Sequence, residues 1–143
     1  MKAKEQDVSE LFQECGIERQ VVITLNHHMY TVKTDIQDNW LFYTFFGFKE
    51  LHKRLVQEGK KPKRMAFIGT GNGVDAIGVY STIDYIEQLL ITDIDPRVIG
   101  LSRYNVERNI QDSSHKPRVH ALVGDLCKPL SHRSVDLVYA NLP

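Results

Sequence analysis

Four continuous apolar runs, each followed by glycine or a polar residue, constrain the fold of this chain more than any other feature. They cover about residues 65–68, 88–92, 119–123 and 135–140. Continuous runs are typical of parallel strands that are buried on both faces, whereas strands with one wet face alternate apolar and polar residues. Right-handed strand–helix–strand units therefore predict an α/β fold: a Rossmann-like, doubly wound, mostly parallel sheet with helices on both faces.

Turn and capping signals place the remaining elements. The expected elements are a short helix at about 7–15, a hairpin of strands 21–25 and 30–32, and helices at about 38–57, 74–80 and 96–110. We therefore divide the chain into an extension over residues 1–60 and a sheet domain over 61–143. The chain stops directly after the fourth apolar run, so we expect the sheet to be truncated there and the natural protein to continue with an aromatic residue.

The composition is that of a globular chain without net charge. Of its 143 residues, 42% are hydrophobic and 25% are charged, and 18 Lys and Arg balance 18 Asp and Glu. A disordered chain is therefore excluded, and an overall field that would gather nucleic acid is absent. Residues 49–64 are locally basic, but we interpret the run 60–64 as a solvated linker rather than a phosphate site.

Cysteine usage and hydropathy favour a cytoplasmic protein without a membrane partner. No apolar run approaches the roughly 20 residues that cross a bilayer, and the charged first residues do not resemble a signal peptide. Cys15 and Cys127 lie far apart, which excludes a disulfide framework and a structural zinc site. We expect no metal: His27 and His28 are interpreted as turn residues and Cys127 as a packing residue.

A glycine-rich turn, Gly69-Thr70-Gly71-Asn72-Gly73, joins the first apolar run to the helix that follows it. Glycines there allow a sharp turn and let a ligand approach the backbone. A dinucleotide fingerprint requires glycine at position 74, where Val74 stands, and the Gly-Lys-Ser/Thr ending of a P-loop is absent. A tight turn that binds no ligand remains the alternative.

Acidic residues follow the next two runs. A carboxylate at Asp93 can accept both hydroxyls of a ribose that lies across the sheet edge. Asp95 precedes Pro96, and we interpret it as the cap of the following helix. Asp125 can accept from an adenine amino group while Leu126 packs on the ring, although a Gly-Asp pair is also an ordinary turn.

The fourth run ends in Asn141-Leu142-Pro143. An amide oxygen beside a backbone carbonyl can accept hydrogens from a planar amino group and fix its nitrogen in front of an electrophile. Because open α/β sheets bind ligands at the carboxyl ends of their strands, the four polar tips together predict one site.

These motifs resemble a known family. RMAFIGTGNGVDAIG, LLITDIDPRVIGLSRYN, ALVGDL and VDLVYANLP match, in order and spacing, the motifs of Rossmann-fold (class I) S-adenosylmethionine-dependent methyltransferases over residues 64–143. The closest resemblance is to amino-methyltransferases with an Asn-Pro-Pro-Tyr-like motif, although Leu142 stands where they have their first proline. A looser similarity runs to methionine S-methyltransferases.

The resemblance implies a role for each tip. The residues that would contact S-adenosylmethionine are Gly69, Thr70, Gly71, Asn72, Gly73, Asp93, Ile94, Asp125, Leu126 and Asn141. The first four would lie against its methionine part, Asp93 would hold the ribose, and Ile94, Asp125 and Leu126 would contact the adenine. Asn141 and Pro143 would orient the methyl acceptor, and S-adenosylhomocysteine would be the product.

The implied activity is methyl transfer to an amino or amide nitrogen by in-line displacement, with catalysis mainly through positioning and desolvation. The acceptor could be a protein side chain, a nucleobase or a small molecule, and zero net charge does not favour nucleic acid. A non-catalytic S-adenosylmethionine-binding or interaction domain, or a small-molecule S-methyltransferase, remains an alternative. A nicotinamide-dependent dehydrogenase is disfavoured by Val74.

Overall fold

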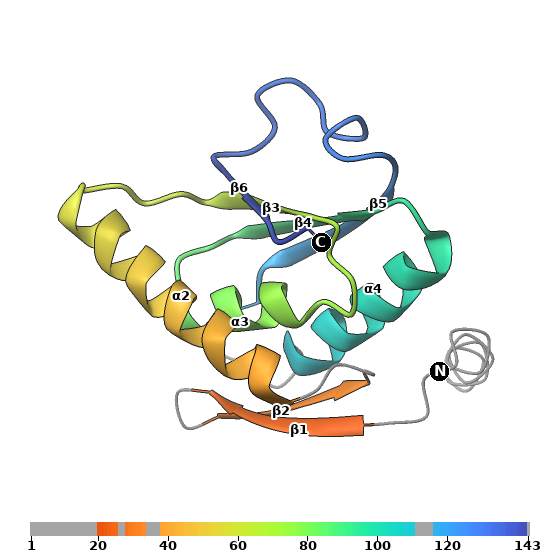
Figure 1. The fold of residues 1–143 in the computed structure, drawn as a ribbon. Helices are drawn as coiled ribbons and strands as arrows, with labels where there is room; N and C mark the ends of the chain where they lie inside the picture. Colours follow the sequence, from red (N-terminus) through yellow and green to blue (C-terminus); the bar gives the residue numbers. More distant parts are fainter. Residues whose placement is uncertain (1–19, 26–27, 34–37, 111–115, 143) are drawn as a thin grey trace.

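The computed structural model describes residues 20–25, 28–33, 38–110 and 116–142 of the chain, and side chains from residue 47 onward (Figure 1). The elements are β1 (Gln20–Leu25), β2 (His28–Lys33), α2 (Asp38–Gln57), β3 (Arg64–Ile68), α3 (Val74–Thr82), β4 (Gln88–Asp93), α4 (Pro96–Ile110), β5 (Arg118–Val123) and β6 (Leu137–Ala140). The predicted hairpin and the three later helices are confirmed, while the short helix expected at 7–15 lies outside the described residues.

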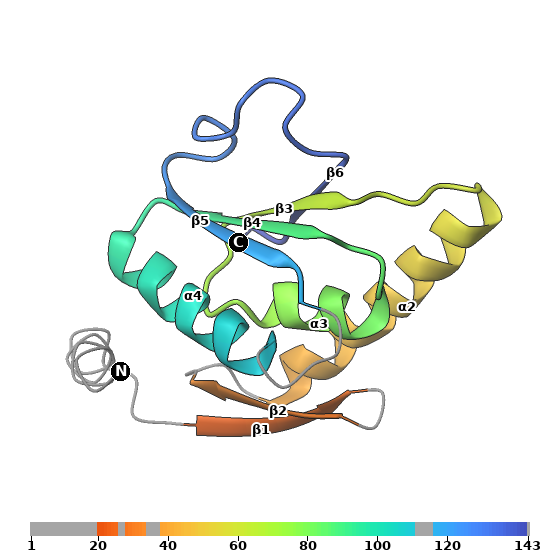
Figure 2. The ribbon, with the colours of Figure 1, turned by 180° about the vertical axis from the view of Figure 1, so that it is seen from behind.

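The central sheet has four strands in the order β5-β4-β3-β6, and every neighbouring pair is parallel. Phe67 of β3 lies between Ile91 of β4 and Tyr139 of β6, so β3 is paired on both sides. The Rossmann-like parallel sheet predicted from the apolar runs is therefore confirmed. The antiparallel hairpin of β1 and β2 lies apart from this sheet, beneath the helices and with β2 beside α4 (Figures 1 and 2).

Helices cover one face of the sheet, because α2, α3 and α4 all lie on the same side (Figures 1 and 2). Helices were expected on both faces, but among the described residues they cover this face and not the other. Right-handed crossovers from β3 to β4 to β5 place α3 and α4 together, and the return from β5 to β6 crosses the other face. That return, residues 124–136, is irregular in the structure. Pro129 lacks an N–H donor, and Leu126 and Arg133 adopt φ of 49° and 56°, which no α-helix accommodates.

Two apolar clusters bury the sheet. The larger lies between the sheet and the helices and contains Phe48, Leu55, Met65, Phe67, Ala76, Ile77, Val79, Tyr80, Ile83, Ile86, Leu89, Ile91, Val106 and Ile110. The smaller contains Ala66, Ile68 and Leu90, with Leu130 and Val135 of the irregular return packed against it. Successive residues of β3 thus enter different clusters, which explains why its sequence is apolar without alternation.

α2 packs closely against α3 at a glycine. A Cβ added at Gly78 of α3 would come within 2.5 Å of the Phe48 ring of α2. Phe48 is 2% exposed and joins the same cluster as Phe67 and Tyr139, so α2 belongs to the core that supports the sheet. Within the described residues, no helix has the length and apolar character required to cross a bilayer.

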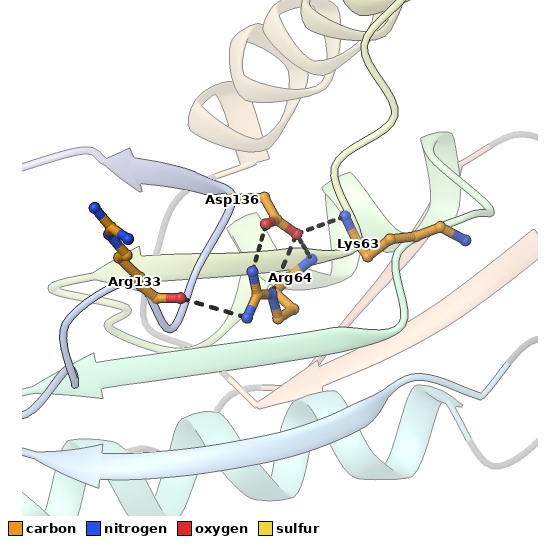
Figure 3. Close-up of polar contacts among 4 residues, drawn as sticks. All are labelled: Lys63, Arg64, Arg133 and Asp136. Atoms are coloured by element: carbon orange, nitrogen blue, oxygen red, sulfur yellow. Dashed lines mark hydrogen bonds and ion pairs between the residues drawn. The ribbon is translucent and has the colours of Figure 1, made fainter.

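Asp136 fixes the register of β6 at the amino end of the sheet (Figure 3). Its Oδ2 accepts from the backbone N–H groups of Lys63 and Arg64 at 3.0 and 2.9 Å, and its Oδ1 lies 2.7 Å from Nη2 of Arg64. Arg64 also donates to the carbonyl of Arg133 at 3.4 Å. The Arg64 contact lowers the pKa of Asp136 to about 2.

The fourth strand was expected from Val135, but it begins at Leu137 because Asp136 makes these contacts and Val135 packs on the far face.

Candidate functional site

The glycine turn and the acidic tip of β4 meet at the carboxyl edge of the sheet. The backbone N–H of Gly71 donates to Oδ2 of Asp93 at 3.3 Å, and Thr70 N donates to the carbonyl of Thr92 at 2.9 Å. The tip of β5 joins them, because Gly124 N donates to the Asp93 carbonyl at 2.9 Å. Three of the four predicted tips are therefore tied together by hydrogen bonds.

The three glycines of the turn have left-handed φ values of 63°, 56° and 84°, but their surroundings differ. A Cβ at Gly73 would lie 2.9 Å from the backbone oxygen of Ser102, so α4 occupies that side. A Cβ at Gly69 would lie 2.6 Å from Cδ2 of Leu142. Among the described residues, apart from its two chain neighbours, no atom lies within 4 Å of the equivalent position at Gly71. Gly73 is therefore a packing residue, and Gly71 is the glycine of this turn with open space in front of it.

Thr70 and Asn72 turn their side chains into the protein, where they are 5% and 7% exposed. Thr70 Oγ1 lies 3.1 Å from Oγ of Ser102, and Asn72 Oδ1 accepts from Val74 N at 3.1 Å. The Asn72 carbonyl accepts from Nδ2 of Asn105 at 2.8 Å. These contacts hold the shape of the turn, so a ligand would meet its backbone rather than these two side chains.

Asp93 ends β4 and Asp95 follows it, and the predicted capping role of Asp95 is confirmed. Asp95 Oδ1 accepts from Arg97 N at 2.9 Å, and its Oδ2 pairs with the Arg97 guanidinium at 2.7 Å. Arg97 lowers the pKa of Asp95 to about 2. Asp95 thus caps α4, while the half-buried Asp93 carboxylate also accepts from Asp95 N at 3.2 Å and faces the glycine turn.

Exposed apolar side chains follow the tips of β4 and β5. Ile94 is 69% exposed and Leu126 is 53% exposed, and Val123 at the end of β5 is also exposed beside Asp93 in the strand register. Asp125 is exposed and pairs with Nζ of Lys128 at 2.6 Å. A carboxylate among apolar side chains suits a flat heterocycle that carries an amino group.

Cys127 is exposed here, so its expected packing role is wrong.

The fourth tip brings a residue that sequence reasoning missed. The side chain of Asn141 hydrogen-bonds the Asp75 carboxyl in the first turn of α3, while Pro143 lies outside the described residues. Burial raises the pKa of Asp75 to about 6, and burial together with Asp75 raises the pKa of Tyr139 to about 12. Asp and Glu are common in the first turn of a helix, where they interact favourably with the helix dipole. The position of Asp75 in the sequence therefore gave no sign of its contact with Asn141.

Comparison with known proteins gives matches in structure alone. No family model and no curated protein sequence matches the chain. A proposed RNA methyltransferase of Pyrococcus horikoshii, PH1948, matches with a TM-score of 0.50 and 18% identity over 78% of this chain and 48% of its own. The Podospora anserina methyltransferase PaMTH1, solved with S-adenosylhomocysteine bound, matches with a TM-score of 0.51 and 18% identity over 75% and 42%.

This chain has the Rossmann-like fold found in methyltransferases. It spans less than half the length of both matched proteins.

Among residues 47–110 and 116–142, no group of three or more His, Cys, Asp or Glu side chains is placed to hold a metal ion.

Proposed function

We propose that this chain binds S-adenosylmethionine at the carboxyl edge of its sheet and acts in methyl transfer. The observation that carries the proposal is the open space at Gly71 beside the Asp93 carboxylate, at the turn between β3 and α3. The similarity in fold to methyltransferases supports it, and one of those proteins was solved with the product S-adenosylhomocysteine.

The residues present suit this cofactor. The loop offers backbone rather than side chains at Gly71, which allows close approach of the methionine part. Asp93 can accept from two ribose hydroxyls with the carboxylate lone pairs that its two backbone contacts leave. Ile94 and Leu126 can sandwich an adenine, and Asp125 can accept from its amino group.

When bound, the cofactor supplies a methyl group on a sulfonium, which leaves without protonation. The chain's own task is to hold and desolvate the acceptor in line with that methyl group. Asn141 lies at the end of β6 beside the glycine turn, where an amide oxygen can accept from a planar amino group. We propose an amino or amide nitrogen as the acceptor on this basis.

Equilibrium binding of labelled S-adenosylmethionine, compared with NAD, tests the cofactor assignment. We expect saturable binding of S-adenosylmethionine, competed by S-adenosylhomocysteine, and no binding of NAD. Asp93→Ala should weaken this binding, and Asp95→Ala is the matched control because its carboxylate caps α4 instead. Binding that survives unchanged in Asp93→Ala contradicts the proposed site.

Transfer of a tritiated methyl group separates a methyltransferase from a non-catalytic binding domain. The acceptors to supply are RNA, a protein extract, free nucleosides and methionine, so that nitrogen and sulfur acceptors are both present. Label in a nitrogen acceptor supports the proposal, and label in methionine identifies an S-methyltransferase. Tight binding with no transfer to any of them identifies the non-catalytic alternative.

A further inference from the structure

The strand β6 directs Asn141 toward α3. Side chains alternate along a strand, so Leu137 and Tyr139 share one side of the sheet, and Asn141 directly after β6 continues this spacing. Leu137 and Tyr139 both pack against the larger apolar cluster between the sheet and the helices, and the Tyr139 ring centroid lies 5.3 Å from that of Phe48. Asn141, next on this side, meets Asp75 at the amino end of α3.

The chemistry of this contact fixes which end of the amide faces Asp75. An ionised carboxylate only accepts hydrogen bonds, whereas an Asn amide has two donors on nitrogen and an acceptor on oxygen. The Asn141 contact lowers the pKa of Asp75, against the effect of burial, and therefore favours the ionised form. Toward the ionised carboxylate the Asn141 amide donates through Nδ2, and Oδ1 is then directed away from Asp75.

We propose that Asp75 is a positioning residue, which holds the Asn141 amide with its oxygen turned toward the acceptor. This rests on the proposed function, in which that oxygen accepts from a planar amino group. Without Asp75, the Asn141 amide could turn its NH2 group toward the methyl acceptor. Both that group and an amino group of the acceptor are hydrogen-bond donors, so they would not form a hydrogen bond with each other. The ionised carboxylate removes that wrong orientation and so selects an amino nitrogen as the acceptor.

The arrangement depends on the protonation of Asp75. A protonated carboxyl gains a donor, and its partner Asn141 can accept that hydrogen only through Oδ1, the atom required for the methyl acceptor. Burial and the Asn141 hydrogen bond set the Asp75 pKa near 6. Tyr139 of β6 is the other titratable side chain that interacts with Asp75 among the described residues, and with a pKa near 12 it stays neutral. The amide should therefore be correctly oriented above pH 6 and reoriented below it.

Side-chain NMR of the whole chain tests this without any acceptor. The 15N and 1H resonances of the Asn141 NH2 group are followed between about pH 4.5 and 8, with and without S-adenosylhomocysteine. We expect a downfield proton above the midpoint, the mark of donation to a carboxylate, and a midpoint near 6. In Asp75→Asn the resonance should no longer titrate, and in Asn141→Ala the Asp75 carboxyl should titrate at higher pH.

Asp84→Asn is the matched control, because it makes the same chemical change at an exposed turn after α3 and should leave the Asn141 titration unaltered. An Asn141 resonance that stays constant across this pH range, or that still titrates in Asp75→Asn, overturns the proposal. Failure of S-adenosylhomocysteine to bind would instead count against the proposed function. The titration without ligand still decides the role of Asp75 in that case.

Discussion

Gly73→Ala should strongly destabilise the fold, because the glycine is enclosed by α4. A Cβ there would lie 2.8 Å from Oγ and 2.9 Å from the backbone oxygen of Ser102, and 2.9 Å from Cγ2 of Val106. The φ of 84° adds a left-handed penalty of about 1–2 kcal/mol, and overpacking typically adds about 1–3 kcal/mol. The sum is about 2–5 kcal/mol, or roughly 6–25 °C in Tm for a domain of this size.

Gly71→Ala separates the strain from the packing. Its φ of 56° carries the same left-handed penalty, but no atom of the described residues beyond its two chain neighbours lies within 4 Å of the new methyl group. We expect a loss of about 1–2 kcal/mol in stability, together with weakened binding of S-adenosylmethionine, because the methyl group occupies the open space in front of the turn.

Thermal and urea unfolding followed by circular dichroism compare the two variants, and titration calorimetry measures the ligand. The reasoning requires Gly73→Ala to be the less stable variant and Gly71→Ala to show the greater loss of affinity in protein that is still folded. Equal losses of stability would show that Ser102 and Val106 do not confine position 73. Full affinity in Gly71→Ala would show that the space at Gly71 is not where the ligand binds.

Three further outcomes are expected. Asp93→Ala should weaken S-adenosylmethionine binding by about 1.5–3 kcal/mol, roughly 10–150-fold, whereas Asp95→Ala should lower the Tm and change the affinity little; calorimetry showing the reverse would exchange their roles. Asp75 has a pKa near 3.8 when unfolded and about 6 when folded, so its contribution to stability is full below pH 3.8 and is lost as the pH rises through 6. The stability of Asp75→Asn relative to wild type should therefore rise by about 2–3 kcal/mol between pH ~4 and ~7.5, and a constant difference in urea unfolding would contradict this. Asp136→Ala should cost about 1–2 kcal/mol, because two backbone donors and Arg64 lose a half-exposed partner; an unchanged urea midpoint would show that these contacts are replaced by water.

The sheet could be predicted from the sequence because its pattern is local. Residues 65–68 of β3 and 89–91 of β4 are apolar without interruption, and both faces of these segments are buried in the structure. The start of β6 could not be predicted in this way, since Val135 is as apolar as the strand that follows. β6 begins only after Asp136, because the Asp136 carboxylate bonds to Lys63 and Arg64. These two residues are more than seventy positions away in the sequence.

The helical cover of the second face was overestimated for a similar reason. Residues 124–136 have the length of a crossover helix, but Pro129 and two residues with positive φ keep this segment irregular. Leu130 and Val135 still bury Ala66, Ile68 and Leu90 from that side. A continuously apolar strand therefore predicts that both faces of the sheet are buried. It does not predict whether a helix or an irregular segment buries them.

At the candidate site, strand-tip position predicted that the glycine turn, Asp93 and the tip of β5 would meet, because parallel strands end at one edge. It could not distinguish among the glycines, whose separate surroundings depend on Ser102 and Leu142. Asp75 was missed because its importance comes from Asn141, which is brought to it only when β6 pairs with β3.

The pairing of β3 with β6 also sets a time constraint during synthesis. Asp136 lies 72 residues after Arg64, so a ribosome adding about 5–20 residues per second makes it roughly 4–14 s later. β4 and β5 are made within that interval, so β4 can pair with the other edge of β3 and β5 can pair with β4. The edge that faces β6 meanwhile presents Ala66 and Phe67 with open backbone groups, which can pair with another unfinished chain. Protection of this one strand edge during translation should therefore govern how much of the protein reaches its folded state.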